Sequence, residues 1–128
     1  MRWHTKTLRA VNRTRGTIVG DCIRVADSPL TGIVGLLGER DLPRGDGLLI
    51  VPCQGVHTLG MRFAIDIVVL DGEWNVIGIR RELRPFRLTR MFWKAAAVLE
   101  LPSGTVESSG TSVGDTFDFN RTDAAVSL

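Results

Sequence analysis

Cysteine is scarce in this chain of 128 residues, which contains only Cys22 and Cys53. Two cysteines are too few for a disulfide scaffold, so we expect both thiols to be free. No apolar run is long enough to form a transmembrane helix. The basic N-terminus also lacks the apolar stretch that a secretory signal requires. These absences predict a reduced, cytoplasmic protein with no membrane span.

Internal repeats, low-complexity tracts and interior linkers are also absent from the sequence. A chain of this length fits one compact domain that buries roughly two-thirds of its unfolded surface. We expect a basic N-terminal arm over residues 1–16, a single β-rich domain over 17–119 and a frayed C-terminal tail over 120–128. The glycines at 35 and 38 are not followed by Lys-Ser or Lys-Thr, so a Gly-rich phosphate-binding loop is excluded.

Positive charge is concentrated in two segments, residues 1–24 and 80–94, although the net charge is only +2. The second segment interleaves the aromatics Phe86, Phe92 and Trp93 with the cations Arg80, Arg81, Arg84, Arg87, Arg90 and Lys94, against the single acid Glu82. This combination is similar to a footprint for nucleic acid or another anionic partner. The simpler interpretation is a solvated arm and a surface loop whose aromatics pin it to the sheet. We therefore expect no specific nucleic-acid partner.

Apolar periodicity predicts a mainly β fold, α+β by count, with one or two short helices. Strands are predicted where apolar residues alternate or form short runs bounded by turn residues, over 17–26, 48–51, 61–70, 75–82, 95–101 and 113–119. A helical turn is the alternative for 95–101. Asp71-Gly72 between two apolar runs predicts a hairpin with a loop longer than two residues, so the flanking strands should pair antiparallel. Short helices are predicted over 28–38 and 105–110.

Seven motifs in a fixed order make the chain similar to a known family. They are Gly-Leu-Leu-Gly (35–38), Leu-Pro-x-Gly-x-Gly-Leu-Leu-Ile (42–50), Pro-Cys-x-x-Val-His-Thr (52–58), Met-Arg-Phe-x-Ile-Asp (61–66), Val-Leu-Asp (69–71), Leu-Glu-Leu-Pro-x-Gly (99–104) and Val-Gly-Asp (113–115). Over about residues 16–119 the chain thus resembles the family catalogued as domain of unknown function 192. The resemblance implies a single compact sandwich- or barrel-like antiparallel sheet assembly with short helices, and no established activity.

The stretch from residue 53 to 71 is the most informative part of the sequence. From 61 to 69 the odd positions are apolar, while the even positions begin polar with Arg62 and include Asp66. This pattern predicts a strand that starts at a groove or edge and ends in the interior. A ligand- or partner-binding rim is predicted at the polar end of this strand, formed by Cys53, His57, Met61, Arg62 and Asp66.

Two functions are compatible with such a rim. The first is a non-catalytic binding or accessory module, a monomer whose partner is an unknown protein or small ligand. The alternative is an enzyme in which His57 works with Cys53 or Asp66 on a small substrate. Cys53 and His57 could also ligate a metal, but two ligands do not complete a structural zinc site. We expect the binding module, with no catalytic residue, no metal and no cofactor.

Asp66 is predicted to stabilise the sheet first and to bind a ligand second. Its neighbours Ile65 and Ile67 are apolar, so the carboxylate should be at least partly buried. Burial is tolerable only if the carboxylate is ionised and accepts hydrogen bonds from backbone N–H groups, from a cation, or from both. Arg62 on the same strand face is about 13 Å away in an extended strand and cannot pair with it directly. Asp71 and Asp115 are expected to be turn carboxylates.

Overall fold

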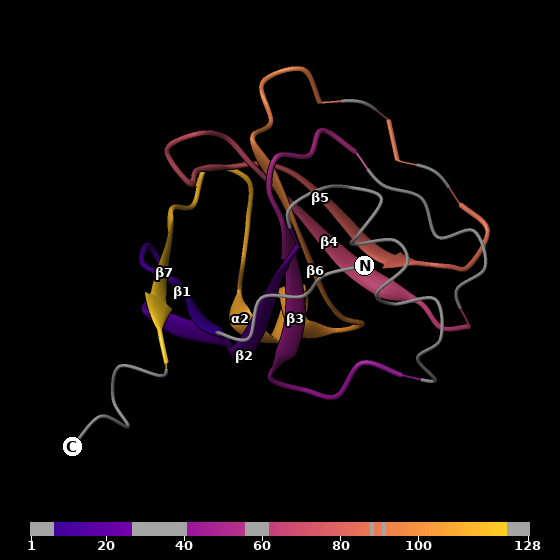
Figure 1. Ribbon diagram of the computed structural model, residues 1–128, viewed down its shortest axis with the longest axis horizontal. Coiled ribbons are helices and arrows are strands. Elements are labelled where there is room, and N and C mark those ends of the chain that lie inside the picture. Colours follow the sequence, from indigo (N-terminus) through magenta and orange to yellow (C-terminus); the bar gives the residue numbers. More distant parts are fainter. Residues whose placement is uncertain (1–6, 27–40, 56–61, 88, 91, 123–128) are drawn as a thin grey trace.

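The computed structural model describes residues 7–26, 41–55, 62–87, 89–90 and 92–122. Its elements in chain order are β1 (Leu8–Asn12), β2 (Thr17–Ala26), β3 (Asp46–Ile50), β4 (Ile65–Leu70), β5 (Val76–Leu83), β6 (Ala97–Pro102), α2 (Thr105–Ser109) and β7 (Phe117–Arg121). All seven strands belong to one sheet with the order β5-β4-β6-β3-β2-β1-β7 (Figure 1). The prediction of a mainly β fold is confirmed.

One strand pair departs from the predicted antiparallel arrangement. β2 and β3 run parallel, with Arg24 opposite Leu48, whereas the other five pairs of the sheet are antiparallel. A parallel pair requires a crossover connection of about a dozen residues or more. Residues 27–45, which separate these two strands in sequence, are long enough for such a crossover. The antiparallel prediction is therefore wrong at this pair and correct for the rest of the sheet.

The sheet is curled into a half-barrel, and the β4–β5 turn contacts the segment that leads into β7 (Figure 1). The N–H of Val76 donates to the carbonyl of Asp115 at 2.7 Å, and the N–H of Phe117 donates to the carbonyl of Trp74 at 2.9 Å. The rings of Trp74 and Phe119 lie with their centroids 4.9 Å apart. These contacts join the β4–β5 hairpin to β7, although β5 and β7 stand at opposite ends of the strand order.

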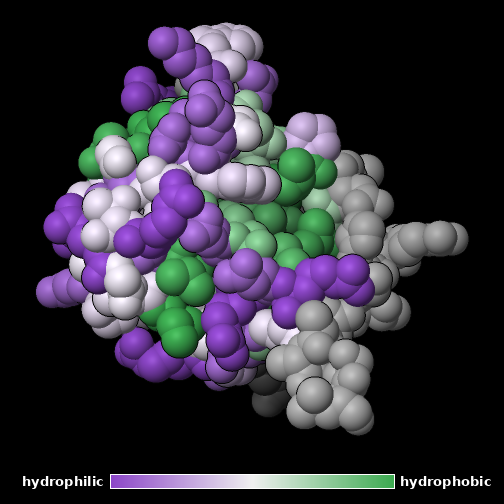
Figure 2. Space-filling view, turned by 90° about the vertical axis from the view of Figure 1, so that its left-hand side faces the viewer, coloured by the Kyte–Doolittle hydropathy of each residue, from purple (hydrophilic) through white to green (hydrophobic). Residues whose placement is uncertain are grey.

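Two hydrophobic cores lie on the two faces of the curled sheet. The concave core takes residues from both ends of the sheet and from α2, among them Ile23, Val68, Leu99, Val106 and Phe117. The convex core covers the outer face of the middle strands and includes Leu48, Ile50, Ile67, Cys53 and Val98. Figure 2 shows an apolar patch bordered by hydrophilic side chains on the side of the molecule that carries β7. β4 and β6 are buried on both faces, which explains why their sequences are apolar almost throughout.

Most of the predicted elements are confirmed within the described residues. The strands predicted over 17–26, 48–51, 75–82, 95–101 and 113–119 correspond to β2, β3, β5, β6 and β7, and the predicted turn over 105–110 is α2. The central strand begins at Ile65, later than predicted, because residues 62–63 form a bend. The helix predicted over 28–38 lies outside the described residues.

The predicted N-terminal arm contributes a strand to the sheet, since β1 lies between β2 and β7. Residues 1–6 and 123–128 lie outside the described part of the chain, so the boundaries of the arm and of the tail stay predictions. No helix among the described residues has the length and apolar character needed to cross a bilayer.

Candidate functional site

Asp66 on β4 is a buried structural acceptor, with an exposed fraction of 1 %. Its carboxylate accepts hydrogen bonds from the backbone N–H groups of Glu82 at 2.8 Å, Gly104 at 3.1 Å and Val106 at 2.9 Å. These donors belong to β5, to the turn before α2 and to α2 itself, so one side chain ties three segments together. The predicted burial of Asp66 and its backbone donors are confirmed. With both oxygens engaged, the carboxylate is poorly placed to act on a substrate.

Cys53 packs in the convex core and is buried. Its Sγ donates a hydrogen bond to the carbonyl of Gly55 at 3.1 Å. Burial, the largest effect, raises the pKa of the Cys53 thiol, and the bond to Gly55 opposes this rise only in part. Because the thiolate is the nucleophilic form of cysteine, a buried thiol with a raised pKa is a poor nucleophile. The described contacts of Cys53 are those of a packed core residue.

The described residues do not bring the predicted rim together. Cys53 belongs to the convex core, whereas the carboxylate of Asp66 faces α2 on the concave side. Arg62 is exposed on the bend before β4. His57 and Met61 lie outside the described residues. Cys53 and Asp66, the two residues considered as partners of His57, therefore lie on opposite faces of the sheet.

Asp115 also holds the fold rather than a reactive site. Its Oδ2 accepts hydrogen bonds from Nδ2 of Asn12 at 2.9 Å, from Nε of Arg15 at 3.0 Å and from the N–H of Ser112 at 2.9 Å. Burial alone raises the pKa of Asp115, but these bonds outweigh burial and lower it below the ordinary value. The turn carboxylate predicted at Asp71 is confirmed, since its Oδ1 accepts from the N–H groups that follow it in the hairpin.

Glu100 is a buried acid that the sequence reading missed. It lies on β6 between Leu48 of β3 and Ile67 of β4, with an exposed fraction of 2 %. Within the described residues its Oε2 has no hydrogen-bond partner. Burial raises the pKa of Glu100 to about 8, so the neutral acid predominates at pH 7. The signal that could have found it is a single acid inside the apolar run Val98 to Leu101.

Ligands for a metal ion do not converge in the part of the chain that the structure describes, where no group of three His, Cys, Asp or Glu side chains is placed to hold one. His57 lies outside that part. The chemistry available to the described residues is therefore recognition by charge, hydrogen bonding and apolar contact.

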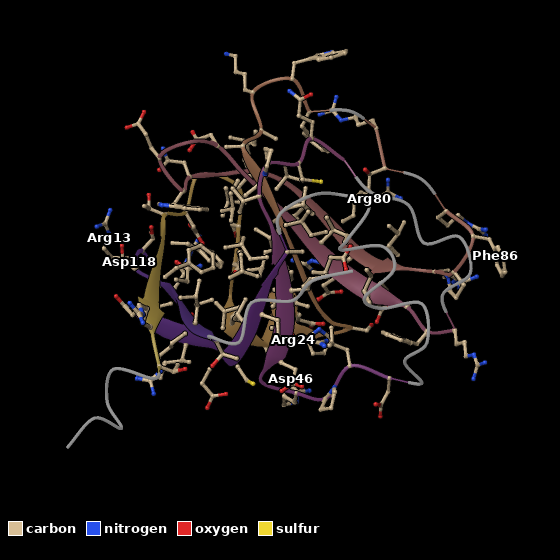
Figure 3. All side chains as sticks on the ribbon, in the orientation of Figure 1. Arg13, Arg24, Asp46, Arg80, Phe86 and Asp118 are labelled. Carbon is tan, nitrogen blue, oxygen red and sulfur yellow. The ribbon has the colours of Figure 1, made fainter. Side chains whose placement is uncertain are left out.

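An exposed group of cations and aromatics follows the edge strand β5. We define the basic-aromatic surface as Arg80, Arg84, Phe86, Arg87, Arg90, Trp93 and Lys94, all of which are exposed. The side chains of Phe86 and Trp93 are 65 % and 78 % exposed. Figure 3 shows Arg80 and Phe86 on the β5 side of the molecule, away from the Arg13–Asp118 ion pair. The prediction that the aromatics pin the loop to the sheet is therefore wrong for Phe86 and Trp93.

Phe92 is the aromatic that does anchor this segment. Its ring lies against Gly78 of β5, where an added Cβ would come within 2.4 Å of the ring. The guanidinium of Arg90 lies over the ring of Phe92, 4.6 Å from the ring centroid. The N–H of Phe92 also donates to the carbonyl of Gln54 at 2.9 Å. With Phe92 fixed, the neighbouring Trp93 is held outward.

Two shallow pockets mark the basic-aromatic surface. One has a volume of about 260 Å³ and is lined by Arg80, Glu82, Leu83, Arg84 and Arg87. The other has a volume of about 320 Å³ and is lined by Ile77, Arg90, Phe92, Trp93 and Lys94. The first pocket is mainly cationic and the second combines cations with apolar walls. Together they can receive carboxylates and an apolar side chain from the same partner.

Comparison with known proteins confirms the resemblance that the motifs indicated. The model of the DUF192 family, described as "Uncharacterized ACR, COG1430", matches residues 10–119. The UPF0127 protein PF1050 of Pyrococcus furiosus is 29 % identical over 116 residues, which cover 87 % of this chain and 97 % of that protein.

Two solved structures have a similar fold. A protein of Sinorhizobium meliloti 1021, described as a "putative transcription regulator", has a TM-score of 0.76 at 20 % identity, over 93 % of this chain and 96 % of that one. A protein of unknown function from Novosphingobium aromaticivorans also has a TM-score of 0.76, at 18 % identity, over 88 % of this chain and 84 % of that one. At these identities the likeness shows the fold alone.

Proposed function

The chain belongs to the DUF192 family, whose description names no activity, and we propose from its geometry that it is a non-catalytic binding module. The occupant we propose is an acidic segment of a partner protein, bound at the basic-aromatic surface. The observation that carries this proposal is the exposure of Trp93 and Phe86 among clustered cations. Tryptophan and arginine are the side chains that most often dominate the energy of protein interfaces.

The residues suited to catalysis give little support to the alternative of an enzyme. Both carboxylate oxygens of Asp66 accept backbone hydrogen bonds, and Asp66 lies on the opposite face of the sheet from Cys53. Cys53 is buried, and its pKa is raised by that burial. A Cys–His or Asp–His couple would need both partners in one accessible site. The described side chains are thus better suited to binding than to a reaction.

Charge favours a carboxylate-rich partner over nucleic acid. Segment 80–94 carries six cations and one acid, which attracts an anionic partner. That acid, Glu82, lines the same pocket as Arg80 and Arg84, and Glu107 lies near it beside Arg81. Fixed negative charges interrupt the basic track and would repel a continuous phosphate backbone. Separate carboxylates on a peptide can instead be placed to avoid them.

One of the two structural neighbours is described as a "putative transcription regulator". Its identity to this chain is 20 %, so this role is a competing hypothesis for the test and not a property carried over.

The test is isothermal titration with a synthetic peptide in which glutamates flank a leucine. A second peptide with glutamine in place of every glutamate measures the contribution of charge. We expect the glutamate peptide to bind at least about tenfold more tightly, and this difference to shrink as salt rises. Trp93→Ala should weaken binding by at least about 1 kcal/mol. Arg80→Gln combined with Lys94→Gln should remove most of the preference for glutamate.

Arg9→Gln is the matched control, because Arg9 is also exposed but lies on β1, outside this surface. It should leave the affinity for the glutamate peptide unchanged. Equal affinity for the two peptides, or an equal loss in the control, would overturn the proposal. Tighter binding of single-stranded DNA that persists at physiological salt would replace it with a nucleic-acid function.

A further inference from the structure

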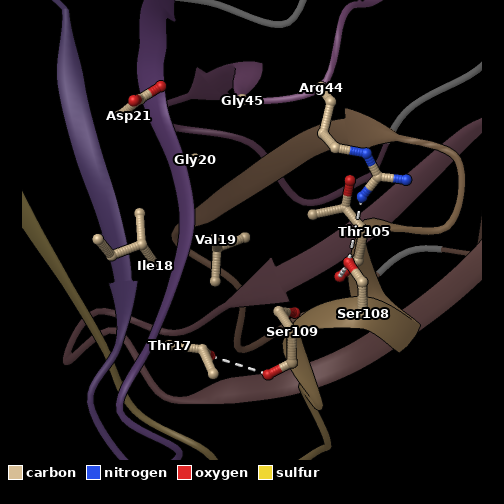
Figure 4. A pocket seen from close by; sticks show the side chains of 10 residues that line it. All are labelled: Thr17, Ile18, Val19, Gly20, Asp21, Arg44, Gly45, Thr105, Ser108 and Ser109. Atoms are coloured by element: carbon tan, nitrogen blue, oxygen red, sulfur yellow. Dashed lines mark hydrogen bonds between the residues drawn. The ribbon is translucent and has the colours of Figure 1, made fainter.

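A second pocket lies between β2 and α2, apart from the basic-aromatic surface (Figure 4). Its volume is about 370 Å³, which is in the range of pockets that hold small molecules. Thr17 closes one end, where its Oγ1 donates to the carbonyl of Ser109 at 2.8 Å. Arg44 and Asp21 lie toward the other end, with Gly20 and Gly45 between them (Figure 4). The pocket therefore has a closed end and a charged end.

Thr105 supplies the first indication of a ligand. It lines the pocket with an exposed fraction of 4 %, and its Oγ1 has no hydrogen-bond partner in the described part of the chain. The hydroxyls of its neighbours are paired: Ser108 Oγ donates to the carbonyl of Thr105 at 3.2 Å, and Ser109 Oγ bonds Thr111 Oγ1 at 2.8 Å. Buried polar groups in native proteins nearly always have a partner. The Thr105 hydroxyl is thus a buried polar group without a partner at the wall of the pocket.

Arg44 supplies the positive charge at the pocket. Its Nη1 donates to Ser108 Oγ at 3.5 Å, the upper limit of a hydrogen bond, and Arg44 takes part in none of the ion pairs found among the described residues. Figure 4 shows the Arg44 side chain extending toward Thr105 and Ser108. A guanidinium binds carboxylate through two parallel hydrogen bonds, which are stronger than one long bond to a hydroxyl. A ligand carboxylate would therefore displace Ser108 from Arg44.

Asp21 narrows the class of ligand. Its side chain is exposed and lines the same pocket as Arg44. The carboxylate of Asp21 repels a multiply charged anion such as phosphate, and it can accept a hydrogen bond from an ammonium or hydroxyl group. Toward the Thr17 end of the pocket, Val19 and Ile18 offer apolar contact (Figure 4).

We propose that this pocket binds a small carboxylate that carries a hydrogen-bond donor, ammonium or hydroxyl, at its other end. Arg44 binds the carboxylate, the Thr105 hydroxyl donates to it, and Asp21 accepts from the donor. This site is separate from the surface proposed for the acidic partner, because the two share no lining residue. Each can be tested without the other.

The test follows backbone amide resonances of the ¹⁵N-labelled full chain during titration with 4-aminobutyrate. Three control probes are titrated in the same way. Butyrate lacks the hydrogen-bond donor, butylamine lacks the carboxylate, and inorganic phosphate is an anion of higher charge. We expect 4-aminobutyrate to shift the amides of Thr105 and Ser108 and to bind more tightly than the other three probes. Arg44→Gln should weaken its binding about tenfold or more, and Thr105→Val about threefold or more.

Asp21→Asn tests the donor end of the ligand alone. It should weaken the binding of 4-aminobutyrate and leave the binding of butyrate unchanged. Arg9→Gln is the matched control, because Arg9 is exposed on β1 and lines neither proposed site, and it should leave every affinity unchanged. The proposal is overturned if phosphate binds more tightly than 4-aminobutyrate, or if Arg44→Gln and Arg9→Gln have equal effects. It is also overturned if millimolar 4-aminobutyrate leaves the amides around Thr105 unshifted while the spectrum shows a folded chain.

Discussion

Asp66 on β4 accepts a hydrogen bond from the N–H of Val106 at 2.9 Å, which fixes α2 against the concave face of the sheet. The same carboxylate oxygen accepts from Gly104 at 3.1 Å, and the other oxygen accepts from Glu82 at 2.8 Å. A single side chain therefore determines where β5 and α2 sit relative to β4. Because it is buried and fully engaged, its replacement affects the fold before it affects any surface.

Asp66→Asn should lower the free energy of unfolding by roughly 1–3 kcal/mol at pH 7. The amide has one acceptor oxygen where the carboxylate has two, so at least one of the three backbone donors loses its partner. Urea denaturation measures the loss. Asp118→Asn on β7 is the control, because its ion pair with Arg13 is exposed and such pairs contribute little. Equal stability of the Asp66 variant and the wild type would show that the carboxylate does not hold α2.

Glu100→Gln should change the pH dependence of stability. The pKa of the Glu100 carboxyl is raised by burial to about 8 in the folded chain, whereas an unfolded glutamate titrates at about 4.3. The folded state thus holds a proton that the unfolded state releases, so the stability contributed by this group is full below about pH 4 and is lost as pH rises toward 8. The loss is on the order of 5 kcal/mol, since one pKa unit corresponds to about 1.4 kcal/mol.

Thermal unfolding between pH 5 and 8 should accordingly show a steeper decline for the wild type than for Glu100→Gln, with the variant more stable at pH 8. Glu107→Gln, which alters an exposed glutamate on α2, should keep the slope of the wild type. Parallel curves for wild type and Glu100→Gln would contradict the raised pKa of Glu100.

Asp115→Asn should change the stability of the fold at acidic pH. Hydrogen bonds from Arg15, Asn12 and Ser112 outweigh burial and lower the pKa of Asp115 in the folded chain. Its contribution to stability is therefore present above the unfolded value of about 3.9 and is lost as pH falls through the folded pKa. The wild type should lose melting temperature on acidification below about pH 4, and part of that loss should vanish in the variant. An identical fall in melting temperature below about pH 4 for the wild type and the variant would contradict this role.

Cys53 should react slowly with a thiol reagent in the folded chain. Burial raises the pKa of its thiol and shields it from solvent. In a Cys22→Ser background, modification by dithiobis-nitrobenzoate should be slow at pH 7.5 and become rapid on addition of denaturant. The Cys53→Ser chain, which retains the exposed Cys22, should react in the folded state. Rapid modification of Cys53 without denaturant would revive the hypothesis of a cysteine nucleophile.

Local sequence patterns predicted most of the strands and the burial of Asp66. Strand periodicity, turn residues and an acid between two isoleucines are all signals that depend only on residues close in sequence. The parallel pairing of β2 with β3 could not be predicted, because it depends on how residues 27–45 cross over and not on either strand. The opposite placement of Cys53 and Asp66 could not be predicted either, because Cys53 lies outside β4 and strand alternation does not relate the two side chains.

The sequence also could not predict which aromatic side chains are exposed. Phe86, Phe92 and Trp93 look equivalent as apolar residues in a basic loop, but a single ring fits over Gly78. Phe92 occupies that place, and Trp93 is left exposed beside it. Glu100 was missed because one acid in an apolar strand reads as a solvent-facing position, whereas β6 is buried on both faces.

The indole N–H resonance of Trp93 gives the most direct test of the proposed binding surface. Trp74 provides an internal reference, because its ring packs against Phe119 at the other side of the sheet. On titration of the ¹⁵N-labelled chain with the glutamate peptide, the indole signal of Trp93 should shift and saturate while that of Trp74 stays in place. The glutamine peptide should cause little change. A saturating shift at Trp74 with none at Trp93, or no shift at either indole, would contradict binding of an acidic partner at the basic-aromatic surface.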